Sequence, residues 1–313
     1  MTRTRPVFDR LRPFSAALAL GGLGLAIPAQ GDELVAARYV EDPGAAERLE
    51  AADRLRTLSH EVASAACHLS GGVAPDTSRK LMVEAKLDFI RIAAALRHGD
   101  ADWKIIGEET DRAILADLDV LDAEWAVTEG AVRRIMDDPQ DGEALGIIKT
   151  ESELLYETSD HLLSELNAEY SNPMDLLQVD AILMDIVGRQ AMLTQKMAKE
   201  ACEIWSGNRS EDRITALIAS KDMFELGIRA LHDGMPELSI PPAPTPGIRY
   251  GLEGVLADWE IVQGHMELVK AGTIGEAEKA DLYARLNDKM YKLEDLVHLY
   301  VEFSKHDYDK SGG

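Results

Sequence analysis

The stretch "GRQAMLTQKMAKEAC" (Gly188 to Cys202) has the pattern of a single helix, and an upstream stretch, "DRLRTLSHEVASAAC" (Asp53 to Cys67), resembles it. Each stretch has an arginine near its start and ends in the dipeptide Ala-Cys, so the only two cysteines of the chain stand at equivalent places. Two similar helices of this kind indicate an internal repeat.

A shift of 135 residues, which carries Cys67 onto Cys202, also aligns residues far from these helices. The matching pairs occur in order along the chain: Arg54 and Arg189, Leu58 and Leu193, Ala63 and Ala198, Phe89 and Phe224, Gly99 and Gly234, and Tyr156 and Tyr291. After a slip of one residue, Trp125 meets Trp259. We interpret the chain as a tandem duplication.

The composition and the spacing of apolar residues predict an all-α fold. Hydrophobic residues make up 46% of the chain and aromatic residues only 5%, and glycine and proline are sparse within the periodic segments. Four helices are expected in each unit, as two tandem up-down four-helix bundles or as one fused eight-helix body. The expected helices cover about 45–69, a second segment ending near 97, 103–136, 144–170, 173–205, 211–232, 250–271 and 274–305. The units are assigned to residues 32–171 and 172–306, with a polar tail at 307–313.

The first 31 residues have the pattern of a signal peptide. Four arginines precede an apolar run from Phe14 to Ala29, and small residues follow, with a cleavage point near Gly31. The alternative is an uncleaved anchor, but the run is short and rich in glycine for a membrane span. We therefore expect a periplasmic protein that does not insert into the membrane after cleavage. Its net charge of −23 disfavours nucleic acid as a partner.

The Gly188–Cys202 helix resembles the signature helix of the PilJ-type domain, the sensory domain of type IV pili methyl-accepting chemotaxis transducers. That family is related to the nitrate-sensing domain of NarX-like histidine kinases. The second unit matches the family pattern strongly and the first unit weakly. The resemblance implies a four-helix ligand-sensing module. In the nitrate sensors such modules pair as parallel dimers, and arginines of the first helices hold the anion.

Carried over onto this chain, the resemblance places the anion-contacting arginine at Arg56 in the first unit but at Ala191 in the second. The next basic position of the family falls on Glu61 and Lys196. Each unit therefore keeps one basic group of the two. The candidate residues for an anion site, with nitrate or nitrite as ligand, are Arg56, Arg54, His60, Arg189, Gln195 and Lys196. The alternative is that Arg54, Arg56 and Arg189 pair with local carboxylates on solvated surfaces.

The implied dimer also bears on the cysteines. If the two units replace the homodimer, the faces that carry Arg56 and Cys67 oppose their counterparts, and Cys67 then lies opposite Cys202. An exported protein with two such cysteines can close a disulfide over a long loop. The alternative is a pair of small, reduced cysteines in a tight helix contact.

No motif of an enzyme is present in the sequence. It has no metal-protease, nucleophile-elbow, phosphate-loop or haem-attachment pattern, and we expect neither a cofactor nor a metal site. Four methionines at core spacing are interpreted as packing residues: Met192, Met197, Met223 and Met290. The leading hypothesis is a ligand-binding module that acts through a membrane receptor or a pilus or chemotaxis component. The alternative is an envelope scaffold that binds no ligand.

Overall fold

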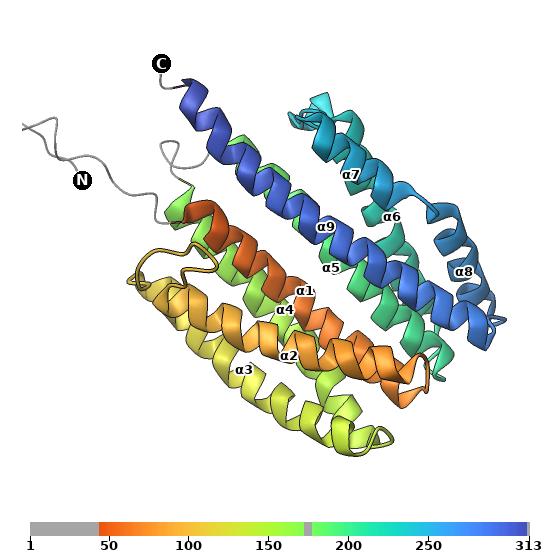
Figure 1. Ribbon diagram of the computed structural model, residues 1–313. Coiled ribbons are helices and arrows are strands. Elements are labelled where there is room, and N and C mark those ends of the chain that lie inside the picture. The colour runs from red at the N-terminus through yellow and green to blue at the C-terminus, as the bar shows by residue number, and fades with distance from the viewer. Residues whose placement is uncertain (1–43, 172–176, 312–313) are drawn as a thin grey trace, which may run out of the picture. The chain divides into compact units, whose positions relative to one another are not determined.

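The computed structural model describes residues 44–171 and 177–311, with side chains up to residue 305. The expected signal peptide and the boundary between the units at 171/172 lie at least partly outside these residues. Within them the structure is all-α, as predicted, with two isolated β-bridges and no strand (Figure 1). Residues Asp42–Gly313 form one compact unit. No helix in the described part of the chain is long and apolar enough to span a membrane.

The first repeat unit contains α1 (Ala45–Ser70), α2 (Pro75–His98), α3 (Arg112–Asp137) and α4 (Gly142–Tyr170). The second contains α5 (Gln178–Trp205), α6 (Glu211–Asp233), a short 3-10 helix (Pro236–Leu238), α7 (Pro246–Leu256), α8 (Trp259–Ala271) and α9 (Glu276–Ser311). The first helix of each unit is central: α1 packs on α2, α4 and α5, and α5 packs on α1, α6 and α9 (Figure 1). The contact between α1 and α5 is called the seam below.

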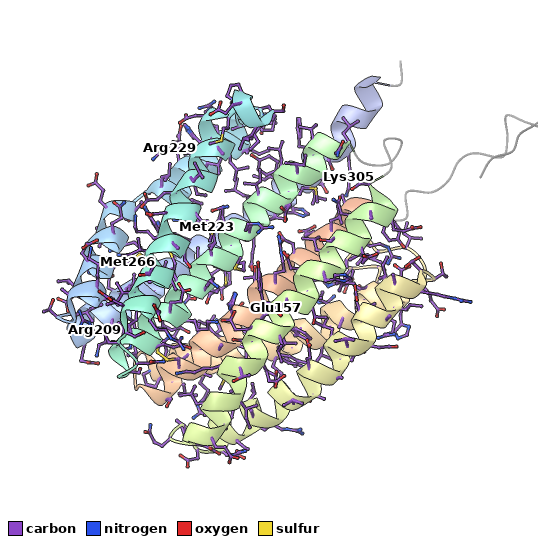
Figure 2. The ribbon with its side chains drawn as sticks, turned by 180° about the vertical axis from the view of Figure 1, so that it is seen from behind. Glu157, Arg209, Met223, Arg229, Met266 and Lys305 are labelled. Carbon is purple, nitrogen blue, oxygen red and sulfur yellow. A yellow bond between two sulfur atoms is a disulfide. The ribbon has the colours of Figure 1, made fainter. Side chains whose placement is uncertain are left out.

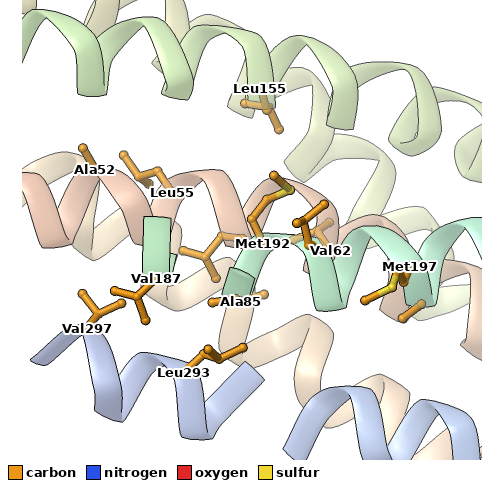
Figure 3. Close-up of a cluster of buried hydrophobic side chains, with 14 of the residues drawn as sticks. Ala52, Leu55, Val62, Ala85, Leu155, Val187, Met192, Met197, Leu293 and Val297 are labelled. Carbon is orange, nitrogen blue, oxygen red and sulfur yellow. The ribbon is translucent and has the colours of Figure 1, made fainter. Parts of the chain in front are cut away.

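Apolar side chains from both units fill the space around the seam. Ala52, Leu55 and Val62 of α1 lie beside α5 and α9, as Figure 3 shows. All three are almost fully buried. Because the helices of both units contribute to this one buried cluster, neither unit has a separate core.

Similar ring contacts occur in the two units. Phe89 stacks on Trp125 with ring centroids 4.0 Å apart, and Phe224 stacks on Trp259 at 4.5 Å. The repeat also includes a turn. The backbones of Asp100 and Ile105 exchange two hydrogen bonds of 3.0 Å, and those of Met235 and Ile240 exchange bonds of 2.8 and 3.1 Å. Each turn follows a glycine with positive φ, Gly99 or Gly234, where an L side chain would be strained.

The start of the third helix differs from the prediction. It begins at Arg112 and not near Trp103, because Asp111 caps it: the carboxylate accepts hydrogen bonds from the backbone N–H groups of Ala113 and Ile114. The preceding residues form the turn just described, a pairing between backbone groups that the apolar pattern alone does not reveal.

The helix expected at 250–271 is also different: it begins earlier, at Pro246, and breaks into α7 and α8. Asp258 at the break has a φ of 59°. The buried ammonium group of Lys289 donates to the carbonyls of Val255 and Ala257, at 2.8 and 2.7 Å. Carbonyls freed from helical bonding thus find a charged donor, which stabilises the break.

One of the four predicted packing methionines is not in the core. Met192, Met197 and Met290 are buried, but Met223 is 51% exposed on α6 (Figure 2). Met223 precedes Phe224, which lies on the buried face of α6, so the Met223 side chain points away from that face.

Candidate functional site

The seam joins equivalent residues of the two units at both ends. Near its start, Asp53 of α1 faces Gly188 of α5, and a Cβ atom at position 188 would overlap the Asp53 carboxylate. Near its end, Cys67 and Cys202 form a disulfide with their Cα atoms 6.2 Å apart. Because both pairs match residues 135 positions apart, α1 and α5 run parallel around a local pseudo-two-fold axis.

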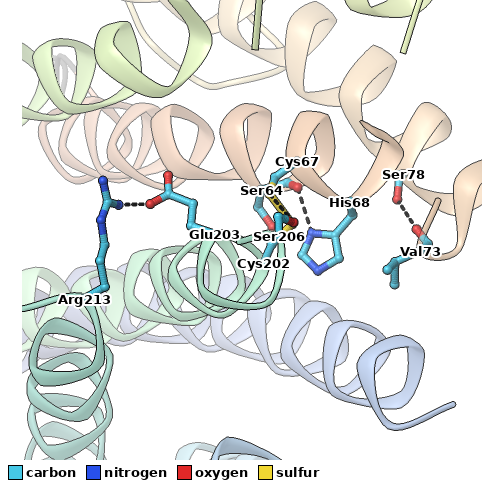
Figure 4. The surroundings of a disulfide bond; sticks show 9 residues. All are labelled: Ser64, Cys67, His68, Val73, Ser78, Cys202, Glu203, Ser206 and Arg213. Carbon is cyan, nitrogen blue, oxygen red and sulfur yellow. Dashed lines mark hydrogen bonds and ion pairs between the residues drawn. A yellow bond between two sulfur atoms is a disulfide. The ribbon is translucent and has the colours of Figure 1, made fainter. Parts of the chain in front are cut away.

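The surroundings of the disulfide are polar but enclosed (Figure 4). The Nδ1 atom of His68 lies 2.8 Å from the carbonyl oxygen of Ser64. The His68 ring also stacks on Tyr283, with ring centroids 3.7 Å apart. Burial lowers the pKa of His68 to about 4, so this ring is neutral at physiological pH. The Arg213 guanidinium forms an ion pair with the buried carboxylate of Glu203. At this end of the seam the disulfide joins α1 to α5 within enclosed, paired side chains, which is typical of a structural contact.

The other end of the seam carries a buried arginine with three acidic partners. The Arg56 side chain is fully buried, and its guanidinium contacts Asp53 on the same helix. It also contacts Asp160 of α4 at 2.8 Å and Asp185 of α5 at 2.9 Å. Arg189, which is 42% exposed, lies 3.8 Å and 3.5 Å from the carboxylates of Asp160 and Asp185. The network therefore ties three helices together and has more carboxylates than guanidinium groups.

A cleft opens beside this network between α1, α4, α5 and α9 and has a volume of about 160 Å³. This first cleft has apolar walls that include Leu49, Leu163 and Met184. Its charged groups are Glu50, Asp53, Arg56, Asp160, Asp185 and Arg189. Four carboxylates and two guanidinium groups thus line it.

A second cleft of about 270 Å³ lies on the other side of α1, between α1, α2, α5 and α9. It adjoins the first, since Glu50, Asp53 and Val297 line both. The cation here is Arg54, the repeat equivalent of Arg189. Its guanidinium contacts Glu61 at 3.0 Å, Asp88 at 3.4 Å and Glu294. Arg56 at the first cleft and Arg54 at the second thus each contact three carboxylates.

The excess of acidic groups shows in their pKa values. Burial raises the pKa of Asp53 to about 6, although Arg56 acts against the shift. Burial also raises the pKa of Glu50 to about 6 and that of Glu294 to about 7. Three carboxyl groups at the clefts thus have pKa values well above the ordinary range for Asp and Glu.

The structure divides the six predicted anion-site residues. Arg56 and Arg189 share the Asp160 and Asp185 carboxylates, whereas Arg54 lies in the second cleft. The bonding of both buried arginines agrees with the alternative expectation of local ion pairs. However, Arg56 makes these pairs at a fully buried position and not on a solvated surface.

The other three predicted residues lie farther along the seam and line neither cleft. His60 is fully buried and stacks on Tyr156 at 5.2 Å. Burial, with Lys199 and Lys196 nearby, lowers its pKa. Gln195 donates to the side-chain oxygen of Asn287 at 2.9 Å, and Lys196 lies 3.9 Å from Glu200.

Several acidic residues of the clefts were not predicted as site residues: Glu50, Asp53, Asp88, Asp160, Asp185 and Glu294. Asp53 had a signal in the sequence, since it is the first residue of the repeated stretch and aligns with Gly188. The others sit in charge-rich helical segments, where a carboxylate that pairs with a buried arginine looks like a solvated one. In the described ranges, no group of three or more His, Cys, Asp or Glu side chains is arranged to hold a metal ion.

No protein-family model matches the chain, and no curated protein matches it.

Proposed function

We propose that the protein is an exported ligand-binding module whose two repeat units form, within one chain, the parallel helix pair that a sensor dimer forms between two chains. The observation that carries this proposal is the pair of adjoining clefts on either side of Asp53 at the seam. The resemblance of the Gly188–Cys202 helix to the PilJ-type signature supports a sensing role. The expected signal peptide supports a periplasmic location, from which the module would act through a membrane receptor or a pilus or chemotaxis component.

The charge at Arg56 does not favour nitrate or nitrite at that position. Its guanidinium already serves three carboxylates, and an anion would have to displace at least one of them. Four carboxylates line the same cleft, so an anion would also meet a repulsive field. We therefore do not restrict the ligand of the binding module to nitrate and nitrite.

A second candidate function, an envelope scaffold without a ligand, is favoured by the ion pairs of Arg56. A fully paired Arg56 joins α1, α4 and α5 and needs no ligand for its charge to be compensated.

The two candidates differ in a thermal-shift experiment on the mature chain, starting at Asp32. The compounds are nitrate, nitrite, chloride, sulfate, and a set of amino acids, amines and small carboxylates. A ligand at 100 times its dissociation constant stabilises the native state by about 2.7 kcal/mol. We expect at least one compound to raise the midpoint of unfolding.

The position of such a ligand is tested by blocking a cleft. The Ser164→Trp variant fills the first cleft from an exposed position of α4, and Thr150→Trp adds the same side chain elsewhere on α4 as the matched control. A ligand of the first cleft loses its shift in Ser164→Trp alone. If no compound stabilises the protein, the scaffold function is the better description.

A further inference from the structure

We infer that the second cleft binds a small organic ammonium ion, held between Trp103 and Tyr291 and facing the carboxylates of Asp88, Glu50 and Glu294. This inference names a ligand class and therefore rests on the proposed function. Four features of the second cleft support it: its aromatic walls, its charge, the buried hydroxyl of Thr57 and its contrast with the first cleft.

The aromatic walls come from two separate parts of the chain. Trp103 belongs to the turn between α2 and α3, and Tyr291 lies on α9. Tyr291 is 44% exposed, so its ring is available at the mouth of the cleft. Indole and phenol rings attract cations through the negative potential of their faces, and rings that line one site are a common means of binding substituted ammonium groups.

The charge of the second cleft favours a cation. Four carboxylates line it, those of Glu50, Asp53, Asp88 and Glu294. Arg54 is the one guanidinium in the lining, and Arg56, just outside it, pairs with Asp53. Arg54 is already surrounded by acidic partners, including the buried Glu61 outside the cleft lining. Burial raises the pKa of Glu294 to about 7, against the opposing effect of Arg54. A bound ammonium ion would stabilise the ionised form of Glu294 and add a partner for the carboxylates that share Arg54.

The inner wall of the cleft adds a polar group without a partner. Thr57 is only 2% exposed, and its hydroxyl makes no hydrogen bond to any described residue. Ile92, Ala191 and Val297 provide apolar surface beside it. A ligand with an ammonium group, an apolar body and one hydroxyl or amine donor matches this arrangement of groups.

The first cleft lacks these features. It has no aromatic side chain, two guanidinium groups instead of one, and a volume of about 160 Å³ against about 270 Å³. The repeat symmetry therefore produces two related clefts, of which the second has the walls and the charge for an organic cation.

Isothermal titration calorimetry of the mature protein with choline tests the inference. Tetramethylammonium is the smaller probe, and 3,3-dimethylbutan-1-ol is the uncharged analogue of choline with nearly the same shape. We expect choline and tetramethylammonium to bind and the uncharged analogue not to bind. The Trp103→Leu and Asp88→Asn variants should each weaken choline binding by about fivefold or more. The control variant Asp102→Asn, at an exposed aspartate next to Trp103, should leave the affinity unchanged.

Three results would overturn the inference: no heat of binding with either cation, equal binding of the uncharged analogue, or unchanged affinity in both variants. The midpoint of unfolding of each variant, measured alongside, shows that it is folded. A failure here is distinguishable from failure of the proposed function. If another compound stabilises the protein and Ser164→Trp abolishes its effect, the module binds a ligand in the first cleft and only the present inference is wrong.

Discussion

Asp53 and Gly188 stand at equivalent positions of the two repeat units and face each other across the seam, with the carboxylate of one filling the space that a side chain of the other would occupy. Arg56 holds the carboxylate there, because its guanidinium donates hydrogen bonds to Oδ1 of Asp53. The ion pair between Asp53 and Arg56 therefore requires glycine at position 188. A substitution at this position tests the packing directly.

The Gly188→Ala variant is expected to be destabilised by about 1–3 kcal/mol, because the added methyl group overlaps a carboxylate that cannot move without breaking its ion pair. Urea unfolding measures the loss. The control is Gly130→Ala at a helical glycine of α3 with open space around it, which should be neutral or gain up to about 1 kcal/mol. Equal effects of the two substitutions would contradict the packing described for the seam.

Replacing Arg56 by methionine is expected to cost about 3–5 kcal/mol, since it leaves Asp53 buried without its counter-charge. The Arg189→Met variant removes a guanidinium that contacts two of the same carboxylates but is 42% exposed, and should cost less than about 1 kcal/mol. Chemical denaturation of both variants, in low and in high salt, checks the contrast. A similar cost at the two positions would mean that Arg56 is not the buried member of the network.

The disulfide should contribute strongly to stability. It closes a loop over a sequence separation of 135 residues, for which the chain-entropy model gives roughly 5 kcal/mol. We expect the Cys67→Ala/Cys202→Ala double variant to unfold at a clearly lower temperature than the wild type. Thiol labelling of the denatured protein without reductant should find no reactive cysteine. Two labelled thiols per chain would show that the pair is reduced.

The stability should depend on pH through Glu294. Its pKa is raised by burial to about 7 in the folded protein, so its contribution is fully present below the unfolded pKa of about 4.3 and is lost as the pH rises through 7. The Glu294→Gln variant imitates the protonated form and lacks this dependence. The free energy of unfolding of the wild type should therefore fall relative to the variant between pH 5.5 and 8.

Comparing wild type and variant at each pH is necessary because the buried histidines act in the opposite sense. The pKa of His68 is lowered to about 4, so the neutral ring favours folding above the unfolded value of about 6.5 and opposes it below. His68 is common to both proteins, and its effect cancels in the difference. A difference that does not change with pH would contradict the assignment of the shift to Glu294.

The sequence predicted the helices well where the apolar pattern was long and regular. The limits of α1, α4 and α6 differ from the expected ones by only a residue or two, since each is bounded by turn residues or capping side chains. The start of α3 and the break before α8 were missed because both depend on contacts from elsewhere: the backbone pairing of Asp100 with Ile105, and the Lys289 ammonium group.

The candidate site was predictable only in part. Arg54 was identified from the repeated stretch and Arg56 from the family resemblance, but their acidic partners were not, because Asp160, Asp185 and Glu294 lie more than 100 residues along the chain from these arginines. Periodicity shows which face of a helix is buried. It does not show which distant carboxylate will meet a given guanidinium, and that choice decides whether a buried arginine is free to hold an anion.

The opposition of Asp53 to Gly188 also has an evolutionary meaning. In a homodimer every residue on the symmetry axis meets its own copy, so an aspartate there would face an aspartate and two like charges would be buried together. With both halves in one polypeptide, a substitution on one side need not appear on the other. Two similar units in one polypeptide can therefore form unequal pairings that two separate, identical chains cannot form, and the acidic side chain that fills its neighbour's vacant place is one of them.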